Sequence, residues 1–118
     1  MSIEGWPSEW LRGVLELCAL RILADGPTYG YAIATRLAES GVGEVKGGTL
    51  YPLLGRLETA GLVETQWRAG EQGPGRKYFS LTALGRTTLN ERLSQWGAFT
   101  TTTNALLELL PPSEEATP

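Results

Sequence analysis

Residues 48–67 read GTLYPLLGRLETAGLVETQW, and the hydrophobic period changes partway along them. Apolar side chains first recur with the spacing of one helix face, at Leu50, Leu53, Leu54 and Leu57. Gly61 then has the place of a helix C-cap, and residues 62–67 read as a strand. The stretch therefore predicts a helix over residues 48–60 that leads directly into a strand.

Downstream of this stretch, the sequence predicts a hairpin and a long helix. Residues 68–75 hold three glycines and a proline, which leaves no room for a regular element. Residues 76–81 read as the returning strand, and Thr82 is a good N-cap. The helix expected over residues 83–109 has apolar side chains at Leu89, Leu93, Trp96, Phe99, Leu106 and Leu110. Pro111 and Pro112 end it.

Two further helices are expected upstream. One covers residues 10–24, with a stripe at Leu11, Val14, Leu15, Cys18 and Ile22 and a second face at Leu17, Leu20 and Leu23. Gly26 and Pro27 end it, and Thr28 is expected to cap a helix over residues 29–40. The order predicts a mainly α fold with a small β-hairpin, a winged helix-turn-helix. A first helix that is apolar on two sides needs two partners, and the last helix has little left within the chain to pack against. Both features indicate a homodimer.

The domain organisation follows from this order. Residues 1–81 are expected to form the winged helix-turn-helix, residues 82–110 the dimerisation helix, and residues 111–118 a disordered acidic tail. A chain of 118 residues, 42 % hydrophobic and 19 % charged, suffices for one domain with a core.

Composition excludes several classes of catalytic and metal site. The chain has no histidine and a single cysteine, Cys18, so imidazole-based catalysis, an internal disulfide and Cys-rich metal sites are excluded. No matched carboxylate pair is evident, and we expect no enzyme activity, metal or cofactor. Cys18 is expected to pack as a small hydrophobe. The absence of a visible signal peptide, and the charges of Arg12, Glu16 and Arg21 within the first apolar segment, predict a cytoplasmic protein without a membrane span.

Charge is distributed unevenly along the chain. The net charge of −3 argues against a nonspecific polyanion binder. Residues 66–90, however, carry four basic side chains against one acidic, whereas residues 91–118 carry one basic against four acidic. Positive charge is therefore concentrated in and around the predicted hairpin.

Three motifs give the chain a resemblance to a known family. They are Tyr29-Gly30-Tyr31, the run from Gly48 to Glu58 with Gly61-Leu62-Val63, and Gly75-Arg76-Lys77-Tyr78-Phe79-Ser80-Leu81-Thr82 with Gly85-Arg86. Over roughly residues 11–96 the sequence resembles the PadR family of bacterial transcriptional regulators, in its short form with one C-terminal helix. It departs from that family in having Lys46-Gly47 where a Ser, Thr or Asn cap is usual, and Phe79 where a tyrosine is favoured.

The resemblance implies a sequence-specific DNA-binding regulator, by family habit a repressor, whose third helix enters the major groove of double-stranded DNA. The residues expected at the DNA are Tyr29, Tyr31, Lys46, Gly48, Thr49, Tyr51, Pro52, Arg56, Arg76 and Lys77. Two recognition helices related by a dimer axis predict a palindromic operator. For several of these residues a structural role in place of DNA contact stays open. Tyr51 could be a core aromatic, and Tyr29 and Tyr31 could be half-buried under the wing. Arg56 could be solvated or paired with Glu58, and the hairpin could be an ordinary solvated one.

The resemblance also implies a possible ligand chamber. In drug-responsive members of the family, a tryptophan at the place of Trp96 lines a flat apolar cavity at the dimer centre. Planar aromatic ligands stack there. The corresponding residues here are Trp10, Leu15, Leu89, Leu93, Trp96 and Phe99. The alternative is a well-packed dimer core without a void. A second function class, a winged-helix module that binds proteins and not DNA, fits the acidic net charge.

Overall fold

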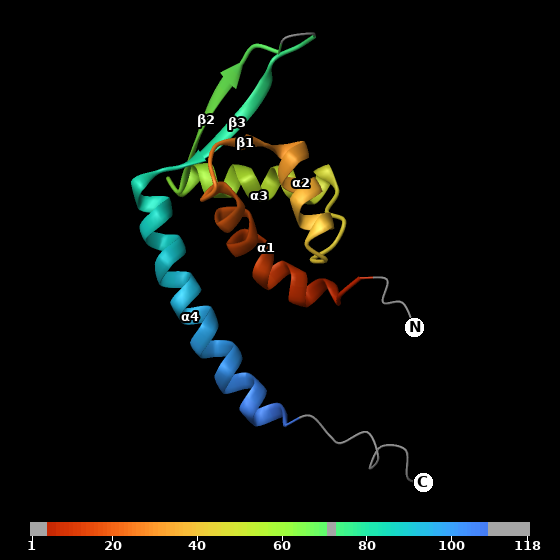
Figure 1. Cartoon of the computed structure of the whole chain (residues 1–118), viewed down its shortest axis with the longest axis vertical. Coiled ribbons are helices and arrows are strands. Elements are labelled where there is room, and N and C mark those ends of the chain that lie inside the picture. The colour runs from red at the N-terminus through yellow and green to blue at the C-terminus, as the bar shows by residue number, and fades with distance from the viewer. Residues whose placement is uncertain (1–4, 71–72, 109–118) are drawn as a thin grey trace.

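Four helices and three short strands make up the described residues, 5–70 and 73–108, of the computed structural model (Figure 1). In chain order they are α1 (Ser8–Leu23), β1 (Thr28–Tyr29), α2 (Gly30–Glu39), α3 (Gly47–Thr59), β2 (Val63–Arg68), β3 (Arg76–Leu81) and α4 (Ala83–Leu107). The first three helices pack together, β2 and β3 project as the wing, and α4 runs away from this body (Figure 1). The expected winged helix-turn-helix is therefore present. None of the helices in these ranges has the length and apolar character of a bilayer span.

The strand β1 corrects the expectation of a two-stranded hairpin. It pairs antiparallel with β3, with Thr28 opposite Phe79 and Tyr29 opposite Tyr78, so the sheet order is β1-β3-β2. Thr28 is therefore a strand residue and not the cap of α2. The cap position belongs to Tyr29, whose side chain makes no capping hydrogen bond. A two-residue strand has no periodicity that a sequence reading can detect.

The core lies between α1, α2, α3 and the inner face of the sheet. The leucines expected on the inner face of α3 are all buried, and so are Ile33, Leu37 and Phe79. In α1 both predicted faces contribute, because Leu15 and Ile22 are buried together with Leu20 and Leu23. Cys18 is half-buried against this core, as expected of a small hydrophobe, and burial raises the pKa of its thiol.

An ion-pair network joins α1 to α2. Asp25 Oδ1 accepts from Arg21 Nη1 at 2.9 Å, and Asp25 Oδ2 accepts from Arg36 Nη2 at 3.2 Å. These hydrogen bonds hold the pKa of the Asp25 carboxyl below its usual value. Arg36 is thus paired with an acidic residue outside its own helix.

The helix α4 begins as predicted and then leaves the core. Thr82 caps it by accepting a hydrogen bond from the Gly85 N–H at 2.9 Å. A Cβ at position 85 would collide with the Leu62 carbonyl oxygen, so this close approach requires glycine. Leu89 is buried, but the later large apolar side chains are exposed: Leu93, Trp96, Phe99, Leu106 and Leu107. Leu109, Leu110, the two prolines and the acidic tail lie outside the described residues.

Candidate nucleic-acid interface

The start of α3 presents unpaired backbone donors. Lys46 occupies the N-cap position in an extended conformation and makes no side-chain cap. Its carbonyl accepts from the N–H groups of Thr49 and Leu50, both at 2.9 Å. The N–H groups of Gly47 and Gly48 precede that of Thr49, which is the first to donate to the Lys46 carbonyl, and both glycines are exposed. Together with the positive end of the helix dipole and the Lys46 ammonium, they suit an anion such as a phosphate.

The outward face of α3 is nearly free of side-chain bulk. Gly48, Pro52 and Gly55 are exposed along it, opposite the buried leucines, and a Cβ at position 48 or 55 would meet nothing within 4 Å. Thr49 and Arg56 lie on one flank of this ridge, and Tyr51 lies on the other. A partner surface can therefore approach the helix backbone closely between these side chains.

Tyr51 is a surface residue laid across the start of α2. Its side chain is 55 % exposed, which excludes the alternative of a core aromatic. A Cβ built on Gly30 would stand 2.6 Å from Tyr51 Oη and 2.7 Å from Cζ. Only glycine at the first position of α2 permits this approach. The Tyr51 ring covers Gly30, which is buried. Tyr51 therefore ties the first turn of α3 to the first turn of α2.

A hollow of about 390 Å³ lies between the start of α2, Tyr51 and the wing. It is lined by Tyr29, Gly30, Tyr31, Tyr51, Trp67, Gly75, Arg76 and Lys77. Five of the side chains predicted from the sequence thus meet in one place, although they come from different elements. Among the residues that the structure describes, its lining includes no acidic side chain. Trp67 was missed, because only the strand register places it beside Lys77.

Arg76 and Lys77 lie on opposite faces of β3, because neighbouring strand residues alternate in direction. The Arg76 guanidinium lies 4.4 Å from the centroid of the Tyr29 ring, and Arg68 lies 4.3 Å from that of Tyr78. Arg68 and Arg76 are direct cross-strand partners, and like charges in that position repel. Stacking each guanidinium on a tyrosine ring offsets part of this repulsion. On the other face, Lys77 Nζ lies 3.8 Å from Glu58 Oε1.

Three further predicted residues, Lys46, Thr49 and Arg56, lie on the side of α3 away from Tyr51. Lys46 and Thr49 line a separate hollow with residues of α1, among them Ser8 and Arg12. Arg56 Nε lies 4.0 Å from Glu16 Oε1, and its side chain is 63 % exposed. The alternative in which Arg56 pairs with Glu58 is wrong, because Glu58 accepts a hydrogen bond from Thr65 at 2.9 Å and faces Lys77.

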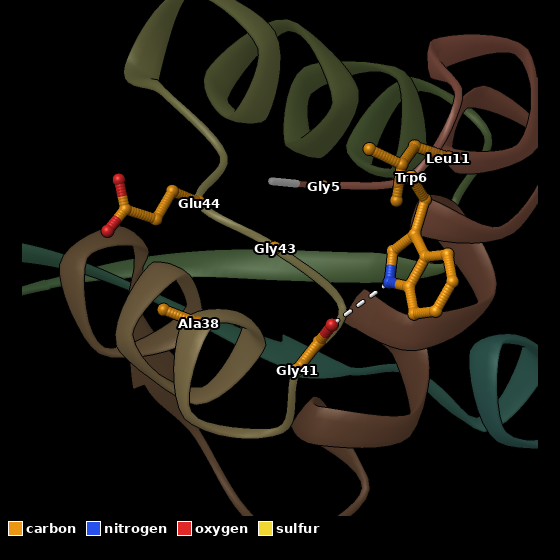
Figure 2. A pocket seen from close by; sticks show the side chains of 7 residues that line it. All are labelled: Gly5, Trp6, Leu11, Ala38, Gly41, Gly43 and Glu44. Atoms are coloured by element: carbon orange, nitrogen blue, oxygen red, sulfur yellow. Dashed lines mark hydrogen bonds between the residues drawn. The ribbon is translucent and has the colours of Figure 1, made fainter. Parts of the chain in front are cut away.

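A hydrogen bond from Trp6, here called the N-terminal clasp, holds the turn between α2 and α3. The Trp6 indole Nε1 donates to the Gly41 carbonyl at 3.1 Å, across a hollow that Ala38, Gly43 and Glu44 also line (Figure 2). This turn leads to Lys46 and the start of α3. The clasp was not predicted, because a hydrogen bond between residues this far apart leaves no local pattern.

The apolar residues expected at a dimer or ligand site divide into two groups. Leu15 and Leu89 are buried in the core of the single chain. Trp10, Leu93, Trp96 and Phe99 are exposed, and the rings of Trp96 and Phe99 lie 5.8 Å apart. The exposed group remains available for a second subunit or a ligand.

Comparisons with known proteins agree with this architecture. The model for the transcriptional regulator PadR-like family matches residues 19–91. A transcriptional regulator of Mycobacterium tuberculosis is 35 % identical over 83 residues, which cover 70 % of this chain and 76 % of that protein.

Solved structures are similar as well. A PadR-like transcriptional regulator from Bacillus cereus has 39 % identity and a TM-score of 0.76, covering 86 % of this chain and 99 % of that one. A PadR family regulator from Eggerthella lenta has 37 % identity and a TM-score of 0.77, covering 86 % and 88 %. The fold class expected from the sequence is thereby confirmed.

Proposed function

The chain belongs to the PadR-like family of transcriptional regulators, and we propose that it represses transcription by occupying a palindromic operator as a homodimer. Regulators of this family bind DNA and typically form dimers, and the homologues are regulators, not enzymes. Occlusion of a promoter requires only the DNA-binding domain that this chain contains.

The hollow beside Tyr51 is the observation that carries this proposal. Its phenolic hydroxyls and two cations are all donors to an anion, and the described residues that line it include no acidic side chain. The carboxylate of Glu58 lies outside the lining, 3.8 Å from the Lys77 ammonium in an exposed pair that a phosphate would have to displace. We assign it to one sugar–phosphate strand, with Tyr29, Tyr31, Tyr51, Arg76 and Lys77 at the phosphates. Because the hollow adjoins α3, a strand held there lies at the edge of the groove that α3 enters.

On this assignment, α3 supplies the contacts within the major groove. The open ridge of Gly48 and Pro52 lets the helix approach the base edges, and Pro52 suits the methyl group of a thymine. Thr49 contacts the groove from the flank, Lys46 neutralises a phosphate at the helix start, and Arg56 contacts DNA further along α3.

We assign the dimer interface to α4 and α1. Residues 1–81 form the DNA-binding part, residues 82–110 the dimerisation helix, and residues 111–118 an acidic tail. Exposed Leu93, Trp96 and Phe99 on α4, with Trp10 on α1, support this division, because a partner subunit would remove large apolar side chains from water. A planar hydrophobic ligand that stacks on Trp96 would release the repressor, and a titration of tryptophan fluorescence with such ligands tests that part.

The central test is selection of bound fragments from the organism's own DNA by the purified protein, followed by measurement of Kd against salt. We expect a palindrome with half-sites about one helical turn apart, and a steep loss of affinity with salt. A monomeric protein that ignores its own upstream region at low ionic strength would contradict the proposal. It would favour the winged-helix protein-binding module.

A further inference from the structure

Trp67 is the most exposed tryptophan among the described residues, at 70 %, and the core does not use it. It lies near the end of β2 and pairs across the sheet with Lys77. By strand alternation it shares the inner face of the wing with Lys77 and the buried Phe79. An indole left in water on a charged hairpin does not stabilise the fold, whereas a bound partner would remove it from water.

The surroundings of Trp67 indicate what it would contact. The indole lines the same hollow as Tyr31, Tyr51 and Lys77. The other side chains of this hollow offer hydroxyl and cationic groups, whereas Trp67 offers a broad apolar ring with one N–H. A DNA strand alternates in the same way, with anionic phosphates separated by deoxyriboses that have apolar faces. The hollow therefore matches both parts of a nucleotide repeat.

We infer that Trp67 packs its indole ring against a deoxyribose of the strand that the hollow receives. This inference rests on the proposed function and deepens it. The tyrosines and cations bind phosphates on either side, and the ring excludes water between them. Such a contact is uncharged and independent of base sequence. It therefore raises the affinity by the same factor for every duplex and at every salt concentration.

The test compares Trp67→Ala with Lys77→Ala in salt titrations on the selected operator and on an unrelated duplex of equal length. For Trp67→Ala we expect affinity to fall about tenfold on both duplexes, with an unchanged slope of log K against log salt. For Lys77→Ala we expect the slope itself to fall by about one. Gln66→Ala is the matched control, because Gln66 is exposed on the opposite face of β2 and should leave affinity unchanged.

Two further measurements distinguish a lost contact between Trp67 and DNA from misfolding of the variant and from failure of the proposed function. Trp67→Phe should bind DNA more tightly than Trp67→Ala, because it keeps an aromatic ring. Adding DNA should also change the tryptophan fluorescence of Trp67→Phe less than it changes that of the unaltered protein. If the unaltered protein binds no duplex, the proposed function fails. If it binds but Trp67→Ala binds equally well, the inference alone is overturned. A loss confined to the operator would also overturn it, because the ring would then read sequence.

Discussion

The Tyr51 phenol lies against the backbone of Gly30, so close that a Cβ at position 30 would stand 2.6 Å from the phenol oxygen. This contact joins the first turns of α2 and α3, and it forms one wall of the hollow that we assign to DNA. It also explains why glycine occupies the first position of α2. The glycine is needed to accommodate a tyrosine that lies more than twenty residues later in the chain.

Gly30→Ala should weaken DNA binding more than it weakens the fold. The added methyl displaces the Tyr51 ring, which is exposed and free to swing outward, so we expect the free energy of unfolding to change by about 1 kcal/mol or less. Affinity for the operator should fall about five- to tenfold, because the ring leaves the hollow. In a Tyr51→Ala background the same substitution should have no further effect on Kd. An equal loss in both backgrounds would contradict the contact.

The wing cations are tested by Arg76→Ala combined with Lys77→Ala. Removing each cation that binds a phosphate should reduce the slope of log K against log salt by about 0.9. Stability should change little, because the Lys77–Glu58 pair is solvent-exposed. Arg36→Ala is a control that removes a cation on the last turn of α2. Undiminished affinity in the double variant would remove the wing from the interface.

Arg56→Ala should lower DNA affinity several-fold while leaving the melting temperature nearly unchanged. Its contact with Glu16 is long and exposed, and such pairs contribute about 0–1 kcal/mol. Glu16→Gln is the matched variant, which removes the competing carboxylate and should leave affinity equal or higher. Thermal unfolding and duplex binding measured on the same samples separate the two roles. A large stability loss with normal affinity would make Arg56 a structural residue.

Trp6→Phe should loosen the turn before α3. The variant keeps an aromatic ring and removes the indole N–H that binds the Gly41 carbonyl (Figure 2). Loss of one exposed hydrogen bond is expected to lower the free energy of unfolding by about 1 kcal/mol or less. Amide hydrogen exchange over residues 41–46 should become faster, whereas exchange in α4 should not change. Unaltered exchange in the turn would show that the clasp has no influence on it.

Trp96→Ala should affect dimerisation or ligand uptake and leave the subunit folded, whereas Leu89→Ala should affect the stability of the subunit. Trp96 is exposed in the single chain, so its loss should weaken dimerisation or ligand uptake, measured by sedimentation and fluorescence, while the subunit stays folded. Leu89 is buried in the same helix, and truncating it should lower the free energy of unfolding by about 2–5 kcal/mol. Unchanged mass and unchanged ligand binding in Trp96→Ala would refute its assigned role.

The features that the sequence predicted correctly depend on nearby residues. The four leucines of α3 repeat within a few turns, and the Thr82 cap acts on the Gly85 N–H. The strand β3 has the bounds that the sequence predicts, because the preceding glycines and proline exclude any other element. Such signals need no knowledge of the rest of the fold.

The features that were missed or misassigned depend on residues far apart in the chain. Thr28 has the local context of a cap, and its pairing with Phe79 leaves no trace in the neighbouring sequence. Arg56 has an acidic neighbour on its own helix, yet its partner lies on α1. Arg76 and Lys77 look like one basic pair, although neighbouring strand residues point to opposite faces.

The amino-acid sequence by itself determined the order of the four helices and of the two wing strands, the inner face of α3, and the family, because periodicity, caps and motifs are local properties of a chain. Only the tertiary structure decided that Tyr51 covers Gly30, that Trp67 lines the same hollow as three tyrosines, and that Trp6 holds the α2–α3 turn. The physical reason is that side-chain contacts across elements depend on strand register and helix packing, which the whole core sets together.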